Sequence, residues 1–167
     1  MRRESLLIVA YVLAVTVTTA ISGALGPLAS VIDSVGIGLV IVVRNELHDC
    51  WGKDAWRWLP VLILMGTAGS LAANAAHPRV ALASGVAFLM ANVAASLLWT
   101  RSRTLAVIAF AVVDSFVFPP VAFGAFVWWV VGGQIAAKIA GAAAWTLVLR
   151  SCTRARRVSG VGDEKIL

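Results

Sequence analysis

The feature that most constrains the fold is a series of six long apolar runs separated by short polar segments. Hydrophobic residues make up 60% of the 167 residues and charged residues only 13%, whereas a soluble globular domain carries about 25% charged residues. A membrane-spanning helix needs about 20 mostly apolar residues, so six spans would use about 120 positions. We therefore expect an all-α membrane protein, a bundle of six transmembrane helices with no room for a sizeable soluble domain.

Glycine, proline and charged residues mark where the apolar runs end. Gly26-Pro27 breaks the first helix, His77-Pro78-Arg79 forms a turn, and Pro119-Pro120 distorts or ends the fifth helix. The polar segment 44–57 is expected to be a loop after a short second helix. The predicted helices cover residues 5–25, 28–43, 58–76, 80–100, 104–121 and 126–149.

The two ends of the chain differ in character. The first apolar run follows Met1-Arg2-Arg3, as it would in a signal peptide. Because residues 6–21 form a longer run than the apolar region of a signal peptide, we expect an uncleaved first helix. The polar C-terminal segment favours a division into a transmembrane domain, residues 1–150, and a cytoplasmic tail, residues 151–167.

Lysine and arginine residues concentrate on one side of the predicted bundle. Cytoplasmic loops of membrane proteins are enriched in these residues, and twelve fall on one side while Arg79 alone falls on the other. This asymmetry predicts a multi-pass inner-membrane protein with both termini in the cytoplasm, and it accounts for the net charge of +6 without nucleic-acid binding. The twelve are Arg2, Arg3, Arg44, Lys53, Arg57, Arg101, Arg103, Arg150, Arg154, Arg156, Arg157 and Lys165.

Two ionisable residues fall in the middle of predicted spans, namely Asp114 in the fifth helix and Lys138 in the sixth. At a rise of ~1.5 Å per residue, both lie ~15 Å into an apolar core ~30 Å thick. A charge in hydrocarbon is costly and usually functional, and an ion pair is the simplest way to keep both residues charged. The pair is either purely structural or part of a polar cavity that receives a solute. Asp33 falls near the outer end of the second helix.

Other polar side chains on the predicted spans could line the same cavity. Asn74, Asn92 and Gln134 are costly to bury, because each amide carries donors and an acceptor that need partners. Ser84 could line the cavity as well, although a serine in a membrane helix often bonds to a carbonyl of its own helix instead. Planar amides and carboxylates suit a planar, hydrogen-bonding ligand such as a nucleobase.

The sequence contains no motif typical of an enzyme or a cofactor site. His48, Asp49 and Cys50 are adjacent, which is not the spacing of metal ligands. Nucleophile–base arrangements, phosphate-binding glycine loops and ATP-binding motifs are also missing from the sequence. We therefore expect no enzyme activity, no metal and no cofactor, and any energy from ATP would have to come from a partner protein.

Three segments carry a resemblance to a known family. They read NELHDCWG at residues 45–52, RVALASGVAF at 79–88 and VDSFVF at 113–118. In this order and spacing, with Lys138 further on, they resemble motifs of the vitamin uptake transporter family, which includes bacterial queuosine precursor transporters. The resemblance covers residues 28–149. The chain departs from the family pattern in having Asn45 where the family usually has aspartate.

The resemblance implies a six-helix fold similar to the substrate-binding subunits of energy-coupling-factor transporters. It also implies import of 7-cyano-7-deazaguanine or its aminomethyl relative. The alternative function is that of a substrate-binding subunit that works only with an ATPase partner, and a homodimer or a non-transporting membrane assembly module is also open. The residues expected at the site are Asp114, Lys138, Asn92, Asn74, Gln134 and Ser84, with Asn45 and Asp49 at its cytoplasmic floor.

Overall fold

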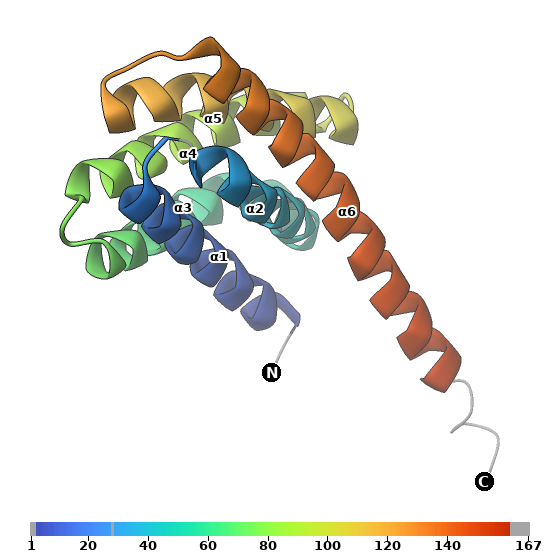
Figure 1. Cartoon of the computed structure of the whole chain (residues 1–167). Coiled ribbons are helices and arrows are strands. Elements are labelled where there is room, and N and C mark those ends of the chain that lie inside the picture. The colour runs from blue at the N-terminus through green and yellow to red at the C-terminus, as the bar shows by residue number, and fades with distance from the viewer. Residues whose placement is uncertain (1–2, 28, 161–167) are drawn as a thin grey trace, which may run out of the picture.

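The computed structural model describes the backbone of residues 3–27 and 29–160, and side chains as far as residue 151. All of the regular structure in these ranges is helical (Figure 1). The elements are α1 (Arg3–Leu25), α2 (Ala29–Trp51), the short 3-10 helix η1 (Gly52–Asp54), α3 (Ala55–Ala73), α4 (Pro78–Trp99), α5 (Arg103–Phe123) and α6 (Trp128–Gly160).

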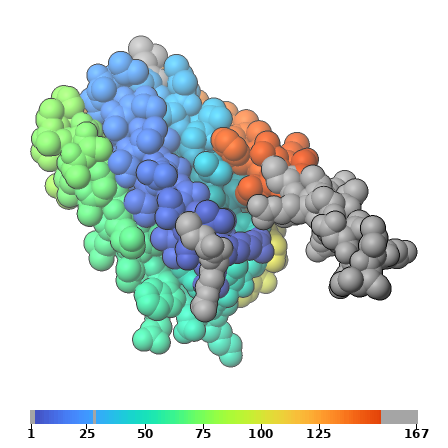
Figure 2. All heavy atoms as spheres, turned by 90° about the horizontal axis from the view of Figure 1, so that it is seen from below, coloured from blue at the N-terminus to red at the C-terminus, as the bar shows by residue number. Residues whose placement is uncertain are grey.

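The six α-helices form a closed ring in which each helix packs against two main neighbours. Going around the ring, α1 is followed by α3, α4, α5, α6 and α2, and α2 packs against α1 again. Figure 2 shows α1 lying along one face of the bundle, with α2 to one side and the α3–α4 pair to the other. The ring encloses an interior to which helices far apart in the sequence contribute.

Charged residues identify the two ends of this bundle. At one end, Arg3 pairs with Glu46, and the Arg103 guanidinium lies 3.1 Å from the Asp49 carboxylate; we call this the charged end. At the opposite end, Arg79 Nε donates a hydrogen bond of 2.8 Å to a backbone carbonyl at the end of α5. These charged residues therefore lie at the ends of the bundle where the predicted helix directions place them, with Arg79 opposite Arg3 and Arg103.

The outer surface of the bundle is apolar. On α4, large aliphatic side chains at helical spacing are exposed, while the alanines on the other face are buried. Four helices, α1, α4, α5 and residues 128–151 of α6, are long and apolar enough to cross a membrane. The expectation of an all-α, membrane-type fold is therefore confirmed. The exposed residues on α4 are Leu82, Val86, Leu89, Val93 and Leu97, and the buried alanines are Ala83, Ala87, Ala91 and Ala95.

Helices α2 and α3 do not belong to this apolar group. Helix α2 carries Asp33, Arg44 and Glu46 along its length, which lowers its hydropathy as a whole. Helix α3 is the shortest of the six, and it contains Arg57 in its first turn and Pro60 one turn later. Helix α2 is therefore the more polar of the two, whereas α3 is short and carries a single charged residue, Arg57, in an otherwise apolar sequence.

The prediction of a loop at residues 44–57 is wrong. Helix α2 continues to Trp51, because Arg44 and Leu47 are fully buried and fix the chain against its neighbours. The helix stops before Gly52, whose φ of 54° suits glycine and interrupts regular helical geometry. Helix α3 begins almost immediately afterwards, at Ala55.

Helices α5 and α6 are also longer than predicted. Helix α5 runs through Pro119 and Pro120 and ends at Gly124, a left-handed cap with a φ of 70°. Helix α6 continues beyond residue 149 to Gly160, since the intervening sequence contains no proline and its arginines favour helix. Residues 151–160 of the predicted polar tail are thus helical, and residues 161–167 lie outside the described part of the chain.

Helices α2 and α6 approach closely because both present glycine at their contact. A Cβ atom added to Gly141 would lie 2.6 Å from the carbonyl oxygen of Val35, and one added to Gly38 would meet the backbone of residues 141 and 142. Small residues permit this kind of helix packing in membranes. A Cβ atom added to Gly132, which is also on α6, would instead lie in open space.

We expect Gly141→Ala to lower the unfolding free energy by about 1–3 kcal/mol, because the added methyl group must push two backbones apart. Gly132→Ala is the matched control, and alanine's better helix propensity should leave it as stable as the wild type or slightly more so. Thermal unfolding in detergent, followed by tryptophan fluorescence, measures both. Equal melting temperatures for the two variants would contradict the close contact.

Candidate functional site

A buried ion pair joins helices α5 and α6. Lys138 Nζ lies 2.7 Å from Asp114 Oδ2, and the two side chains are only 2% and 5% exposed. The ammonium group also donates to Ser115 Oγ at 2.7 Å and to Gln134 Oε1 at 3.2 Å. The three N–H groups of the lysine therefore have three acceptors. The pairing of Asp114 with Lys138, predicted from their equal depth, is confirmed.

Gln134 extends this network from α6 to α2. Its Nε2 donates to Ser30 Oγ at 2.7 Å, while its Oε1 accepts from Lys138. Ser30 in turn donates to the carbonyl of Pro27 at 2.5 Å. Both ends of the amide are thus engaged, which fixes its orientation and leaves the side chain fully buried.

A second carboxylate, Asp33, lies on α2 near the same network. It is buried and accepts a hydrogen bond from Ser22 Oγ on α1. In the sequence it falls near the outer end of the predicted second helix, and it is not among the expected site residues. The signal that identified Asp114, a carboxylate within an apolar run, also applies to Asp33 and could have identified it.

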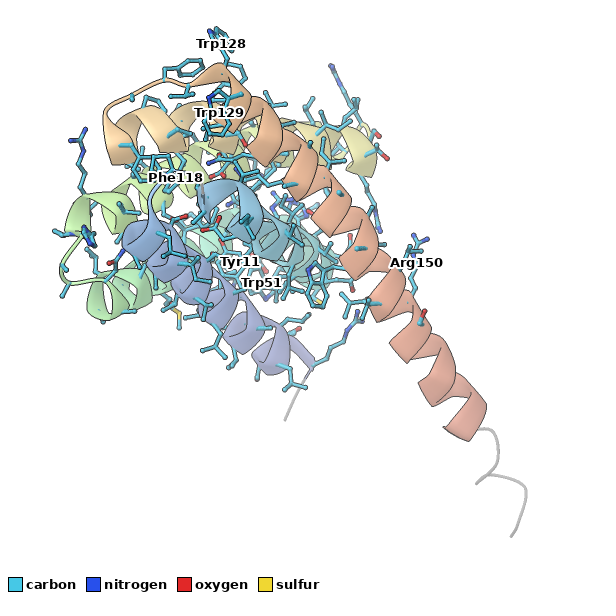
Figure 3. All side chains as sticks on the ribbon, viewed as in Figure 1. Tyr11, Trp51, Phe118, Trp128, Trp129 and Arg150 are labelled. Atoms are coloured by element: carbon cyan, nitrogen blue, oxygen red, sulfur yellow. The ribbon has the colours of Figure 1, made fainter. Side chains whose placement is uncertain are left out.

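These groups line one polar cavity that is surrounded by five helices, α3 being the exception. Phe88 and Phe118 supply apolar walls, and Figure 3 shows Phe118 within the upper part of the bundle. The space open to the centre of a water molecule is about 20 Å³, which suits one or two waters. The lining residues are Thr18, Thr19, Ser22, Ser30, Asp33, Ser34, Ile37, Ser84, Phe88, Asp114, Phe118, Gln134 and Lys138.

The cavity lies in the half of the bundle away from the charged end. Its lining residues come from the C-terminal halves of α1 and α5 and from the N-terminal halves of α2, α4 and α6. These are the halves that meet near Arg79 and near the tryptophans that begin α6. Trp128 and Trp129 stand exposed at that end, well away from Arg150 (Figure 3).

The structure brings four of the eight predicted site residues to this cavity, namely Asp114, Lys138, Gln134 and Ser84. The other four lie elsewhere. Asn74 donates a weak 3.4 Å hydrogen bond to the carbonyl of Thr19 on α1. Asp49 is exposed and pairs with Arg103, while Asn45 and Asn92 both bind Arg44. Asn45 and Asp49 therefore do not form the floor of the cavity, because α2 continues as a helix and carries them toward the charged end.

Arg44 forms a second polar cluster between the cavity and the charged end. Its side chain is fully buried, and its Nε donates to Asn92 Oδ1 at 2.9 Å. Further bonds reach Ser96 and, at 3.1 Å, Asn45 Oδ1, and the guanidinium lies 5.6 Å from the Trp99 ring. Among the described residues Arg44 makes no ion pair. An arginine at the end of an apolar run usually faces the membrane surface, and the sequence therefore did not predict its inward position.

Two prolines follow the ion pair by about one turn of α5. Proline has no N–H, so Pro119 and Pro120 leave the carbonyls of Ser115 and Phe116 without their usual helical donors. Membrane helices tolerate such carbonyls where polar groups are available nearby. They add hydrogen-bond acceptors to the helix segment that carries Asp114.

Comparison with known proteins adds no assignment, because no protein-family model, no curated protein and no solved structure matches the chain. In the part of the chain that the structure describes, no group of three or more His, Cys, Asp or Glu residues could hold a metal.

Removing one partner of the buried pair should cost more than removing both. We expect Lys138→Met to destabilise the protein by about 3–5 kcal/mol, because it leaves the Asp114 carboxylate buried without a counter-charge. The double variant Lys138→Met/Asp114→Asn should recover much of that loss. Thermal unfolding of both single variants and the double variant completes a double-mutant cycle. Additive effects would show that the two charges do not stabilise each other.

Proposed function

We propose that the protein is an inner-membrane importer of a small planar metabolite, with the cavity around Asp114 and Lys138 as its binding site. The observation that carries this proposal is a set of buried charges around a polar cavity within a bundle whose surface is apolar. Such charges are costly in a membrane and typically mark the path of a solute. By the resemblance of three sequence segments, the substrate is a queuosine precursor such as 7-cyano-7-deazaguanine.

In this proposal all six helices cross the membrane and both termini are cytoplasmic. Helix α2 can cross despite its charges, because the Asp33 and Arg44 side chains are buried in the bundle rather than exposed to lipid. Helix α3 is short, but its one charged residue, Arg57, lies in its first turn. The charged end then lies in the cytoplasm, and the cavity lies in the outer half. The inner half is closed by packed side chains, among them Tyr11, Ile41 and Phe110, and this arrangement suits a site that receives solute from outside.

The cavity offers the contacts that a heteroaromatic ring requires. Asp114 can accept hydrogen bonds from ring N–H groups, and the amide of Gln134 can both donate and accept. Phe88 and Phe118 provide flat apolar surfaces suited to a planar ring. Because the present space is large enough only for water, binding requires the lining helices to move apart, as expected for alternating access.

Uptake of labelled precursor into cells that lack their own transporter tests the proposal. Asp114→Asn should reduce the uptake rate at least tenfold, which corresponds to one lost charge-assisted hydrogen bond of about 1.5–3 kcal/mol. Asp49→Asn is the matched control, because Asp49 is exposed and far from the cavity, and it should transport at the wild-type rate. Normal uptake by a well-expressed Asp114→Asn protein would exclude this binding site.

Transport of the same substrate distinguishes a complete importer from the alternative function, that of a binding subunit that depends on an ATPase. Purified protein in liposomes should exchange labelled precursor without any other protein if it is a complete transporter. A protein that gains thermal stability on adding the precursor but transports only after an ATPase complex is supplied would be such a subunit. Absence of both binding and transport for all deazapurines would overturn both functions.

Cysteine labelling tests the proposed orientation. Cys50 is exposed near the charged end, and Cys152→Ser leaves it as the one thiol of the chain. A membrane-impermeant maleimide should not label Cys50 in intact cells but should label it after lysis. Ala125→Cys in a cysteine-free background is the control at the opposite end, and it should react in intact cells. The reverse pattern would invert the topology.

A further inference from the structure

The cavity contains an imbalance of charge. Two carboxylates, Asp33 and Asp114, and one ammonium group, Lys138, line it together. If all three were ionised, the cavity would carry a net charge of −1 in an environment of low dielectric constant. An isolated carboxylate in such surroundings is strongly destabilised, and it usually becomes neutral by binding a proton.

The structure assigns Lys138 to Asp114, and no cation among the described side chains contacts Asp33. All three N–H groups of Lys138 are engaged by Asp114, Ser115 and Gln134. Asp33 receives a hydrogen bond from the uncharged hydroxyl of Ser22. It is therefore the carboxylate of this cavity whose charge is not compensated.

Among the residues whose side chains the structure describes, no other charge near Asp33 supplies the missing compensation. The titratable groups that share its cavity are Asp114 from α5 and Lys138 from α6, whereas α1 and α4 contribute hydroxyl groups and one phenylalanine. Arg44 is on the same helix but eleven residues further on, roughly 16 Å away. Its donors are directed to Asn45, Asn92 and Ser96 instead.

A proton fits this position better than a metal cation. Protonation turns Asp33 into a neutral group that can still hydrogen-bond with Ser22, and it adds no positive charge beside Lys138. A sodium ion would add one, and the Lys138 ammonium in the same cavity would repel it. The small free space also favours a proton, which needs none.

We propose that Asp33 binds and releases the proton that drives uptake, so that the protein is a proton–solute symporter. A proton from the outer side forms an O–H bond with the Asp33 carboxylate while the cavity takes up solute. After the bundle opens inward, that O–H bond breaks and the proton leaves to the cytoplasm, which restores the carboxylate. This inference rests on the proposed function for its transport step, but protonation of Asp33 can be tested without any transport.

Infrared difference spectroscopy of the purified protein in lipid nanodiscs provides that test. The wild type should show the C=O stretch of a buried, protonated carboxylic acid, which should disappear as the pH is raised. Asp33→Asn should abolish this band, whereas the exposed-site control Asp49→Asn should retain it. A band that is absent from the wild type at every pH at which it stays folded, or that survives Asp33→Asn, would overturn the proposal.

Proteoliposomes with the membrane potential clamped at zero test the coupling. One proton per solute allows about tenfold accumulation for each pH unit of gradient, because a pH unit is worth 1.36 kcal/mol. The wild type and Asp49→Asn should reach this tenfold accumulation, and a pH-sensitive dye inside the liposomes should report a matching entry of protons. Asp33→Asn should not accumulate solute. Accumulation driven by a sodium gradient instead would overturn the proton assignment. If the wild type transports no solute, the proposed function is wrong. The infrared measurement decides independently whether Asp33 binds a proton.

Discussion

The structure depends on one electrostatic contact, the ion pair between Asp114 and Lys138 in the interior of an apolar bundle. Two opposite charges can remain in such a place only when they meet and when their remaining hydrogen bonds are satisfied. Ser115 and Gln134 complete the lysine's bonding, and Gln134 then carries the network across to α2. The positions of three helices are thereby tied to one requirement, that the Asp114 and Lys138 charges meet and that the remaining hydrogen bonds of the lysine are satisfied.

The remainder of the bundle follows a different rule, which is that its surface is apolar and its interior is unusually polar. Exposed leucine and valine side chains cover the outside, whereas several serine, threonine and asparagine residues are buried together with Asp33, Arg44, Asp114 and Lys138. In water this distribution would be unfavourable, but in lipid the exposed side chains match their solvent and the polar groups find partners only inside. The helices are held by close packing and by hydrogen bonds, since lipid supplies no hydrophobic driving force between them.

Sequence reasoning predicted the features that follow from helix length and depth. The meeting of Asp114 and Lys138 could be predicted because consecutive antiparallel helices bring equal depths together, irrespective of the details of packing. The inward position of Arg44 could not be predicted, since a charge at the end of an apolar run usually faces the lipid headgroups. Which way such a side chain turns is decided by tertiary partners, here Asn92 and Ser96, and these are 48 and 52 residues away along the chain.

The close contact between α2 and α6 has a mechanical consequence. With glycine at the interface, the backbone of one helix packs directly on the backbone of the other, so α2 and α6 form one closely packed unit. Helices α4 and α5 pack at least as extensively and form a second such unit. The Asp114–Lys138 bond connects the two units, since one residue belongs to α5 and the other to α6. A displacement of one unit against the other would therefore lengthen this contact between two buried charges, so the ion pair couples the positions of the two units.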